Sequence, residues 1–162
     1  MKRSRFLFII GIVAAILVSG GTFIYVTQFA PQTVVQVNSD RINCRQGNVL
    51  DGVERQARFT VLSTCEKAIG IVHDMKGTKE DDGDYEFSLD VEHPYKRLLN
   101  EQNKLHRNGM LVVEIIPKDQ NLSTVQIPKN DDRIEVHGAW VRDNPAFGWN
   151  EIHPVWIVNI LP

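Results

Sequence analysis

Hydrophobic residues follow two different patterns along this chain, and the change between them comes early. Residues 6–26 are almost continuously apolar and include no charged side chain. At about 1.5 Å per residue, a helix of that length matches the roughly 30 Å hydrocarbon core of a bilayer. From Arg58 onward, apolar and polar positions instead alternate, which is typical of half-buried strands. The sequence therefore predicts one transmembrane helix followed by one β domain.

Basic residues before the apolar segment predict its orientation. Three of them lie within residues 1–5, and the first acidic residue is Asp40. Because cytoplasmic flanks carry an excess of lysine and arginine, we expect a single-pass protein of the cell membrane with its N-terminus in the cytoplasm. A cleaved signal peptide is the alternative, since Val18-Ser19-Gly20 offers small residues behind an apolar run. Both alternatives place the C-terminal domain outside the cytoplasm.

The alternating region predicts a barrel domain at 57–162, after a membrane-proximal linker with short strands at 27–56. Its clearest strand is 84–92, where large apolar residues alternate with polar ones. Asp82-Gly83 has the residue types of a tight hairpin turn, so this strand should pair antiparallel with one at 68–72. Further strands are expected at 110–116, 133–140 and 155–161, with Gly138 as a bend or bulge in 133–140.

One amphipathic helix is predicted between the second and third strands, within residues 93–109. Pro94 suits its first turn, and Asn108-Gly109 suits its end. Its apolar face would consist of Tyr95, Leu98, Leu99, Gln102 and Leu105. Five strands and one short helix favour a mainly β fold, a small closed barrel, because closure leaves no exposed strand edge.

Charge and cysteine content agree with an exported domain. The chain has a net charge of −2, and the domain is more acidic still because the N-terminal basic residues lie outside it. An acidic domain disfavours nucleic acid as a partner, since binding to phosphates relies on cationic side chains. Cys44 and Cys65 are the two cysteines, and we expect them to form a disulfide in an oxidising compartment.

Four stretches of the domain resemble a known family pattern. They are DGD at 82–84, LVVEIIP at 111–117, VHG at 136–138 and WNEIHPV at 149–155. In this order they resemble poorly characterised OB-fold domains of exported microbial proteins, over residues 64–161. The resemblance implies an OB-like five-stranded barrel and is nearly silent on activity. One departure is the helix, which an OB-fold usually carries between its third and fourth strands.

Glu114 is the one charged residue of the apolar strand 110–116, where an ionised carboxylate needs a partner. We expect a buried polar pair with His153, with Arg133 as the other candidate partner. A functional interpretation adds Glu151 and makes an acid-base or metal-binding cluster. The structural interpretation, in which Glu114 and His153 only support the fold, is the one we favour, so we expect no metal site and no cofactor.

Aromatic residues near the C-terminus offer a second candidate site. Trp140 and Trp156 lie in predicted strands and should pack inside, whereas Phe147 and Trp149 lie in a loop and should be exposed. With Glu151 and His153, this exposed pair is our candidate ligand-binding surface, because aromatic rings stack on bases and sugars.

Two further features are expected on the surface. The acidic stretch 80–84 with Glu86 is interpreted as a solvated hairpin tip, because its spacing does not match a calcium-binding loop. Asn121 lies in an Asn-Leu-Ser sequon within the loop 117–132, which makes it a possible glycosylation site.

The sequence carries no nucleophile motif and no phosphate-binding glycine loop. It therefore favours a membrane-anchored interaction module that binds a protein, a glycan or another ligand outside the cytoplasm. The alternatives are an accessory subunit of a membrane complex, a protein that binds single-stranded nucleic acid, and a hydrolase or metalloenzyme.

Overall fold

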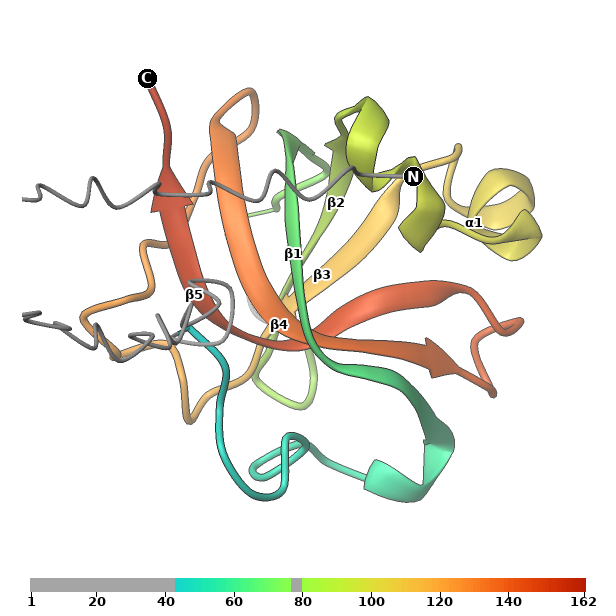
Figure 1. Cartoon of the computed structure of the whole chain (residues 1–162), viewed down its shortest axis with the longest axis vertical. Helices are drawn as coiled ribbons and strands as arrows, with labels where there is room; N and C mark the ends of the chain where they lie inside the picture. Colours follow the sequence, from blue (N-terminus) through green and yellow to red (C-terminus); the bar gives the residue numbers. More distant parts are fainter. Residues whose placement is uncertain (1–42, 77–79) are drawn as a thin grey trace, which may run out of the picture. The chain divides into compact units, whose positions relative to one another are not determined.

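Five strands close into a barrel in the computed structural model, which describes residues 43–76 and 80–162 (Figure 1). The strands are β1 Phe59–His73, β2 Tyr85–Val91, β3 Leu111–Ile115, β4 Arg133–Asp143 and β5 Asn150–Ile160. Their order around the barrel is β1-β2-β3-β5-β4. The prediction of a mainly β fold with a closed five-stranded barrel is confirmed.

The long strand β1 closes the barrel because it pairs antiparallel with both β2 and β4. β2 also pairs antiparallel with β3, and β4 with β5, whereas β3 and β5 run parallel. The register of β4 against β5 shifts at Gly138. A Cβ at this position would lie 2.4 Å from the Ile152 Cγ2 atom and from the Pro154 carbonyl oxygen, so only glycine allows this close approach.

Alternating side chains of all five strands fill the barrel. The largest ones that are fully buried there include Phe87, Leu89, Leu111, Ile115, Ile134 and Ile152. A second apolar cluster lies where residues 43–58 pack against the barrel. Val49, Leu50 and Val53 from this segment belong to the cluster, together with Trp156 of β5. The Cys44–Cys65 disulfide ties the same segment to β1, as predicted.

Two short helices replace the single helix predicted at 93–109. A 3-10 helix, η3, covers His93–Leu98, and α1 covers Glu101–His106. Asn100 separates them because its side chain caps α1, accepting hydrogen bonds from the backbone N–H groups of Gln102 and Asn103. Leu105, which was expected on the apolar face, is 67% exposed as a result.

The connection between β1 and β2 is longer than the predicted tight turn, spanning residues 74–84. Asp82-Gly83 instead belongs to a turn just before β2, in which the Gly83 N–H donates to the Glu80 carbonyl. The predicted antiparallel pairing of the two strands is nevertheless present, with Gly70 opposite Val91.

The predicted transmembrane segment 6–26 lies outside the described residues, as does the part 27–42 of the linker expected at 27–56. The described part of that linker, 43–56, has turns and no strand. None of the helices within 43–76 and 80–162 is long and apolar enough to cross a membrane.

Candidate functional site around His153

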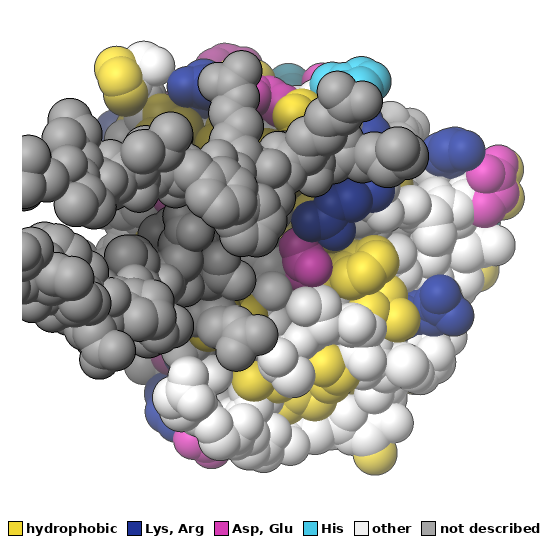
Figure 2. Space-filling view, in the orientation of Figure 1, with side chains coloured by type: hydrophobic (Ala, Val, Ile, Leu, Met, Phe, Trp, Pro, Cys, Tyr) yellow, Lys and Arg dark blue, Asp and Glu magenta, His cyan; other side chains and the backbone are white. Residues whose placement is uncertain are grey.

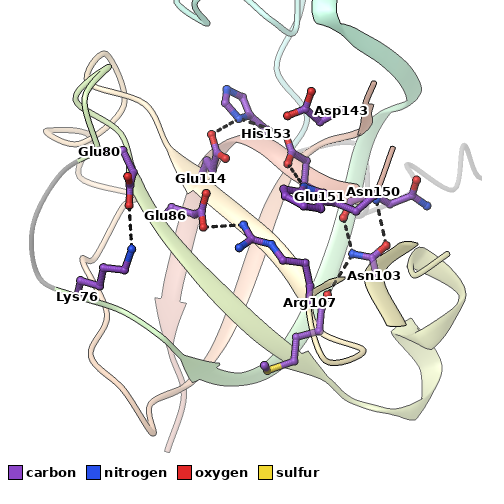
Figure 3. Close-up of polar contacts among 12 residues, drawn as sticks. Lys76, Glu80, Glu86, Asn103, Arg107, Glu114, Asp143, Asn150, Glu151 and His153 are labelled. Carbon is purple, nitrogen blue, oxygen red and sulfur yellow. Dashed lines mark hydrogen bonds and ion pairs between the residues drawn. The ribbon is translucent and has the colours of Figure 1, made fainter. Parts of the chain in front are cut away.

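Parallel pairing of β3 with β5 positions the polar cluster at the centre of the site. Val112 lies opposite Glu151 and Val113 opposite Ile152, so the same register brings Glu114 beside His153. β2 pairs with β3 on its other side, with Glu86 opposite Glu114, and places Asp84 next to this pair. Figure 3 shows Glu114, Glu151 and His153 converging from the two strands.

His153 lies between three carboxylates. Its Nδ1 atom contacts Glu114 Oε2 and lies 3.5 Å from Glu151 Oε1, and its Nε2 atom lies 3.8 Å from Asp84 Oδ2. The side chains of His153 and Glu151 are 4% and 1% exposed. The ring of Phe59 covers the imidazole, with 4.7 Å between the ring centres. The cluster is therefore largely removed from bulk water.

Burial and charge act on the cluster together. Burial alone would lower the pKa of His153, but the contacts with Glu114 and Glu151 outweigh it and raise that pKa to about 10. Burial and the charge of Glu114 raise the pKa of Asp84 to about 7. Burial also raises the pKa of Glu114, against the opposing effect of His153. The site thus holds protons that exposed carboxylates would release at neutral pH.

Two polar atoms of the cluster have no hydrogen bond among the described residues. They are Glu151 Oε1 and His153 Nε2, whereas the other ring nitrogen, Nδ1, is in close contact with Glu114. Arg58, which lines the adjacent cavity, is already paired with the buried carboxylate of Asp143. Buried polar atoms are nearly always partnered, so these two atoms suggest that the cluster binds a further group.

A cavity of about 240 Å³ leads to the cluster from solvent. Asp84 and Glu114 line it, and its other lining residues include the four acidic residues Glu80, Asp81, Asp82 and Glu86, together with Arg55 and Arg58. The acidic stretch expected as a solvated tip therefore forms a wall of this cavity. Asp84 is itself buried, because it faces His153.

An aromatic surface lies at the loop between β4 and β5 and consists of His106, Arg107, Phe147 and Trp149. Phe147 is 68% exposed and stacks on His106 with 4.3 Å between ring centres. The Arg107 guanidinium lies 4.3 Å from the centre of the Trp149 ring. Trp149 connects this surface to the cluster, because its indole N–H donates to Glu151 Oε2 at 3.1 Å.

Left-handed backbone conformations shape this loop. Phe147 and Gly148 have φ angles of 58° and 79°, and a positive φ is rare for a bulky side chain. The Asn100 side chain holds the loop by donating to the Gly148 carbonyl at 2.8 Å. The ring of Phe147 is thus held in an exposed position by its surroundings.

The structure places the remaining candidates as follows. Glu114 contacts His153 and not Arg133, which begins β4 and pairs with Glu92. Trp156 is buried, Trp140 packs against the core, and Trp149 is half-buried. Asn121 is exposed.

Sequence reasoning missed Asp84 as a member of the cluster. The alternation within 84–92 assigned Asp84 to the polar face together with Glu86, but it gave no sign that this face is buried beside His153. Only its position next to the Asp82-Gly83 turn, which directs the chain over the end of β3, brings it to His153.

Comparisons of the chain with protein-family models, with curated proteins and with solved structures found no match. The functional proposal below therefore draws on the fold and on the two sites just described.

Proposed function

We propose that this protein is a membrane-anchored, extracytoplasmic OB-fold-like interaction module that binds a protein or glycan partner on its aromatic surface. The observation that carries the proposal is the exposed ring of Phe147, held with a positive φ angle beside Trp149 and Arg107. Residues held in strained backbone conformations cluster at binding and active sites, and an exposed ring gains no burial that would offset the strain.

Strand order supports the OB-like assignment. A five-stranded barrel in which the first strand pairs with the second and the fourth, with β3 and β5 adjacent, fits a closed Greek-key barrel of this class. OB-folds bind ligands partly through the loop between strands 4 and 5. Phe147 and Trp149 occupy that loop here.

Composition of the aromatic surface supports a protein or glycan partner. Tryptophan and arginine are the residues most enriched at binding hot spots, and planar rings also stack on sugars. Nucleic acid is less favoured, because the neighbouring cavity is lined mainly by carboxylates. On the face drawn in Figure 2, basic side chains are scattered among other residues rather than gathered into a continuous area.

Two observations support the anchor and the location outside the cytoplasm. The uncharged segment 6–26 is long enough to span a bilayer and follows basic residues. The Cys44–Cys65 disulfide fits an oxidising compartment.

Site-specific photo-cross-linking on washed native membranes tests the proposal. A benzophenone amino acid replaces Phe147 in the full-length chain, and as a matched control it replaces Ile127, another exposed apolar residue in a different loop. We expect a discrete adduct from position 147 and none from position 127. Adding Trp149→Ala should reduce the adduct at least about fivefold, as loss of a hot-spot contact would.

The outcomes of this experiment separate the alternatives. A protein adduct that migrates within a stable complex identifies an accessory subunit, and one that shifts on glycosidase treatment identifies a glycan. Equal labelling from positions 147 and 127 would contradict the aromatic surface. Recovery of the intact full-length chain in the soluble fraction would contradict the anchor.

A further inference from the structure

We propose that Asp84, Glu114 and His153 bind one divalent transition-metal ion, with Zn²⁺ as the best match, in a site that opens to the acidic cavity. This inference goes beyond the interaction surface and does not depend on it. It also departs from the sequence-based expectation that no metal site is present.

Geometry is the first support. Each of the three residues offers one ligand atom, and these atoms all lie within 4.8 Å of one another. Zinc binds imidazole nitrogen and carboxylate oxygen at about 2.0 to 2.2 Å. Asp84 would move towards an ion on Nε2, and Glu114 would turn from its contact with Nδ1 towards the same ion. Three protein ligands leave a fourth position for water, and the cavity of about 240 Å³ can supply it.

An unpartnered ring nitrogen is the second, independent support. His153 Nε2 is buried, makes no hydrogen bond among the described residues, and faces Asp84. Burying a ring nitrogen without a partner lowers the stability of the fold, unless the nitrogen binds a group that the protein does not itself supply. A metal ion bound to Nε2 would displace the proton that the imidazole carries at neutral pH and would also pair with both acids.

Charge also points to a cation. Three carboxylates, Asp84, Glu114 and Glu151, face one imidazole, and the nearby Arg58 is already paired with Asp143. Acidic residues also form most of the cavity lining, which would raise the local concentration of cations.

The ligand set selects the kind of metal. Ca²⁺ takes six to eight oxygen ligands and Mg²⁺ keeps most of its waters, whereas one imidazole with two carboxylates suits Zn²⁺ or a similar transition metal. Glu151 would then orient the imidazole from its Nδ1 side, as carboxylates commonly do for metal-bound histidines. The Trp149 indole holds Glu151 in place.

Metal titration of the purified full-length protein, stripped with a chelator and dialysed, tests the inference. Calorimetry with ZnCl₂ at pH 7 should give one equivalent bound with micromolar affinity or tighter, and a higher melting temperature. MgCl₂ and CaCl₂ at the same concentrations should give neither effect. Zinc binding should also change tryptophan fluorescence, because Trp149 contacts Glu151.

Two isosteric variants and one control make the test specific. Asp84→Asn and Glu114→Gln should each weaken zinc binding at least about tenfold, in line with the loss of a ligand. Asp81→Asn removes an equal charge from the same cavity wall and should change affinity less than about threefold. Circular dichroism verifies that each variant is folded, and if one is not, the other decides the result.

Three outcomes would overturn the inference. The first is the absence of stoichiometric zinc binding to the native protein. The second is zinc binding that all three variants retain. The third is an equal loss of affinity in Asp81→Asn, which would show general attraction of cations by the cavity. In each case the cluster is a proton-sharing contact between strands, and the aromatic surface of the proposed function is unaffected.

Discussion

At the scale of single residues, Asp84 is the clearest case of a side chain whose position opposes stability. It is buried beside Glu114, so in the metal-free protein its charged form is disfavoured, and its pKa rises from 3.8 to about 7. Between these two values the folded state binds a proton that the unfolded state has released. Stability therefore falls as pH rises from about 4 to about 7.

Asp84→Asn should for this reason stabilise the metal-free protein at pH 8. We expect the free energy of unfolding in the presence of a chelator to rise by about 1 to 3 kcal/mol, from the size of the pKa shift. The gain should shrink as pH falls, become small near pH 4 and vanish below about pH 3, where aspartate is protonated in both states. Urea unfolding at pH 4, 6 and 8 measures this difference.

Asp81→Asn is the control for this prediction, because Asp81 is exposed. A loss of stability in Asp84→Asn at pH 8 would show that the carboxylate supports the fold. A gain in stability, together with lost zinc binding, would show that Asp84 is retained for binding at a cost to the fold.

At the scale of elements, the helix α1 owes its position to asparagine side chains. Asn103 is fully buried, its amide nitrogen donates to the carbonyls of Met110 and Asn150, and its oxygen accepts from the Asn150 N–H. Asn100 donates to the Gly148 carbonyl. These bonds join α1 to the start of β5 and thus hold the aromatic surface together.

Asn103→Ala should lower the free energy of unfolding by about 2 to 4 kcal/mol, because it leaves several buried backbone groups without partners. Gln102→Ala, in the same helix, should change it by less than about 0.5 kcal/mol. Urea denaturation measures both. Equal effects of the two substitutions would show that helix content, rather than the buried amide, sets the stability of this region.

The Asn103 substitution should also weaken binding at the aromatic surface. His106 lies one helical turn after Asn103 and is followed by Arg107, and Phe147 stacks on His106. A displaced helix would therefore separate the two halves of the surface, which the cross-linking yield from position 147 would report.

At the scale of the whole molecule, the disulfide fixes residues 43–58 to the barrel. Cys44 and Cys65 are 21 residues apart. Closing a loop of that size lowers the entropy of the unfolded chain and thereby raises the free energy of unfolding by about 3 kcal/mol. Val49, Leu50 and Val53 also pack on the barrel. This segment is therefore part of the folded unit that carries the site.

Replacing both cysteines by serine should lower the free energy of unfolding by about 3 kcal/mol. The wild-type protein should show the same loss in the presence of a reductant, whereas the serine variant should be insensitive to it. Chemical denaturation of the wild-type protein and of the serine variant, each with and without reductant, measures these differences. A wild-type stability that does not change on verified reduction would contradict the chain-entropy explanation.

Much of the fold could be predicted from local pattern. Alternation located β2 and β4, because side chains of a strand face the core at every second position, and a continuous apolar run located β3. Gly138 marked the register shift. Strand ends were less predictable. β1 begins at Phe59 and β5 at Asn150, well before the predicted strands at 68–72 and 155–161, because pairing partners rather than local pattern extend them.

The split of the predicted helix has a similar origin. The residues 93–109 have helical periodicity, but Asn100 bonds to Gly148 and Asn150, which are distant in sequence. Such contacts override local propensity, because they satisfy buried polar groups that a continuous helix would leave unpaired.

The sequence by itself determined the mainly β character of the domain, the pairing of its two cysteines and the need of Glu114 for a partner, because each follows from the chemistry of neighbouring residues. Only the tertiary structure decided that this partner is His153 rather than Arg133, and that Asp84 joins them. The reason is that the parallel register of β3 and β5, and the turn before β2, bring together residues that no local pattern connects.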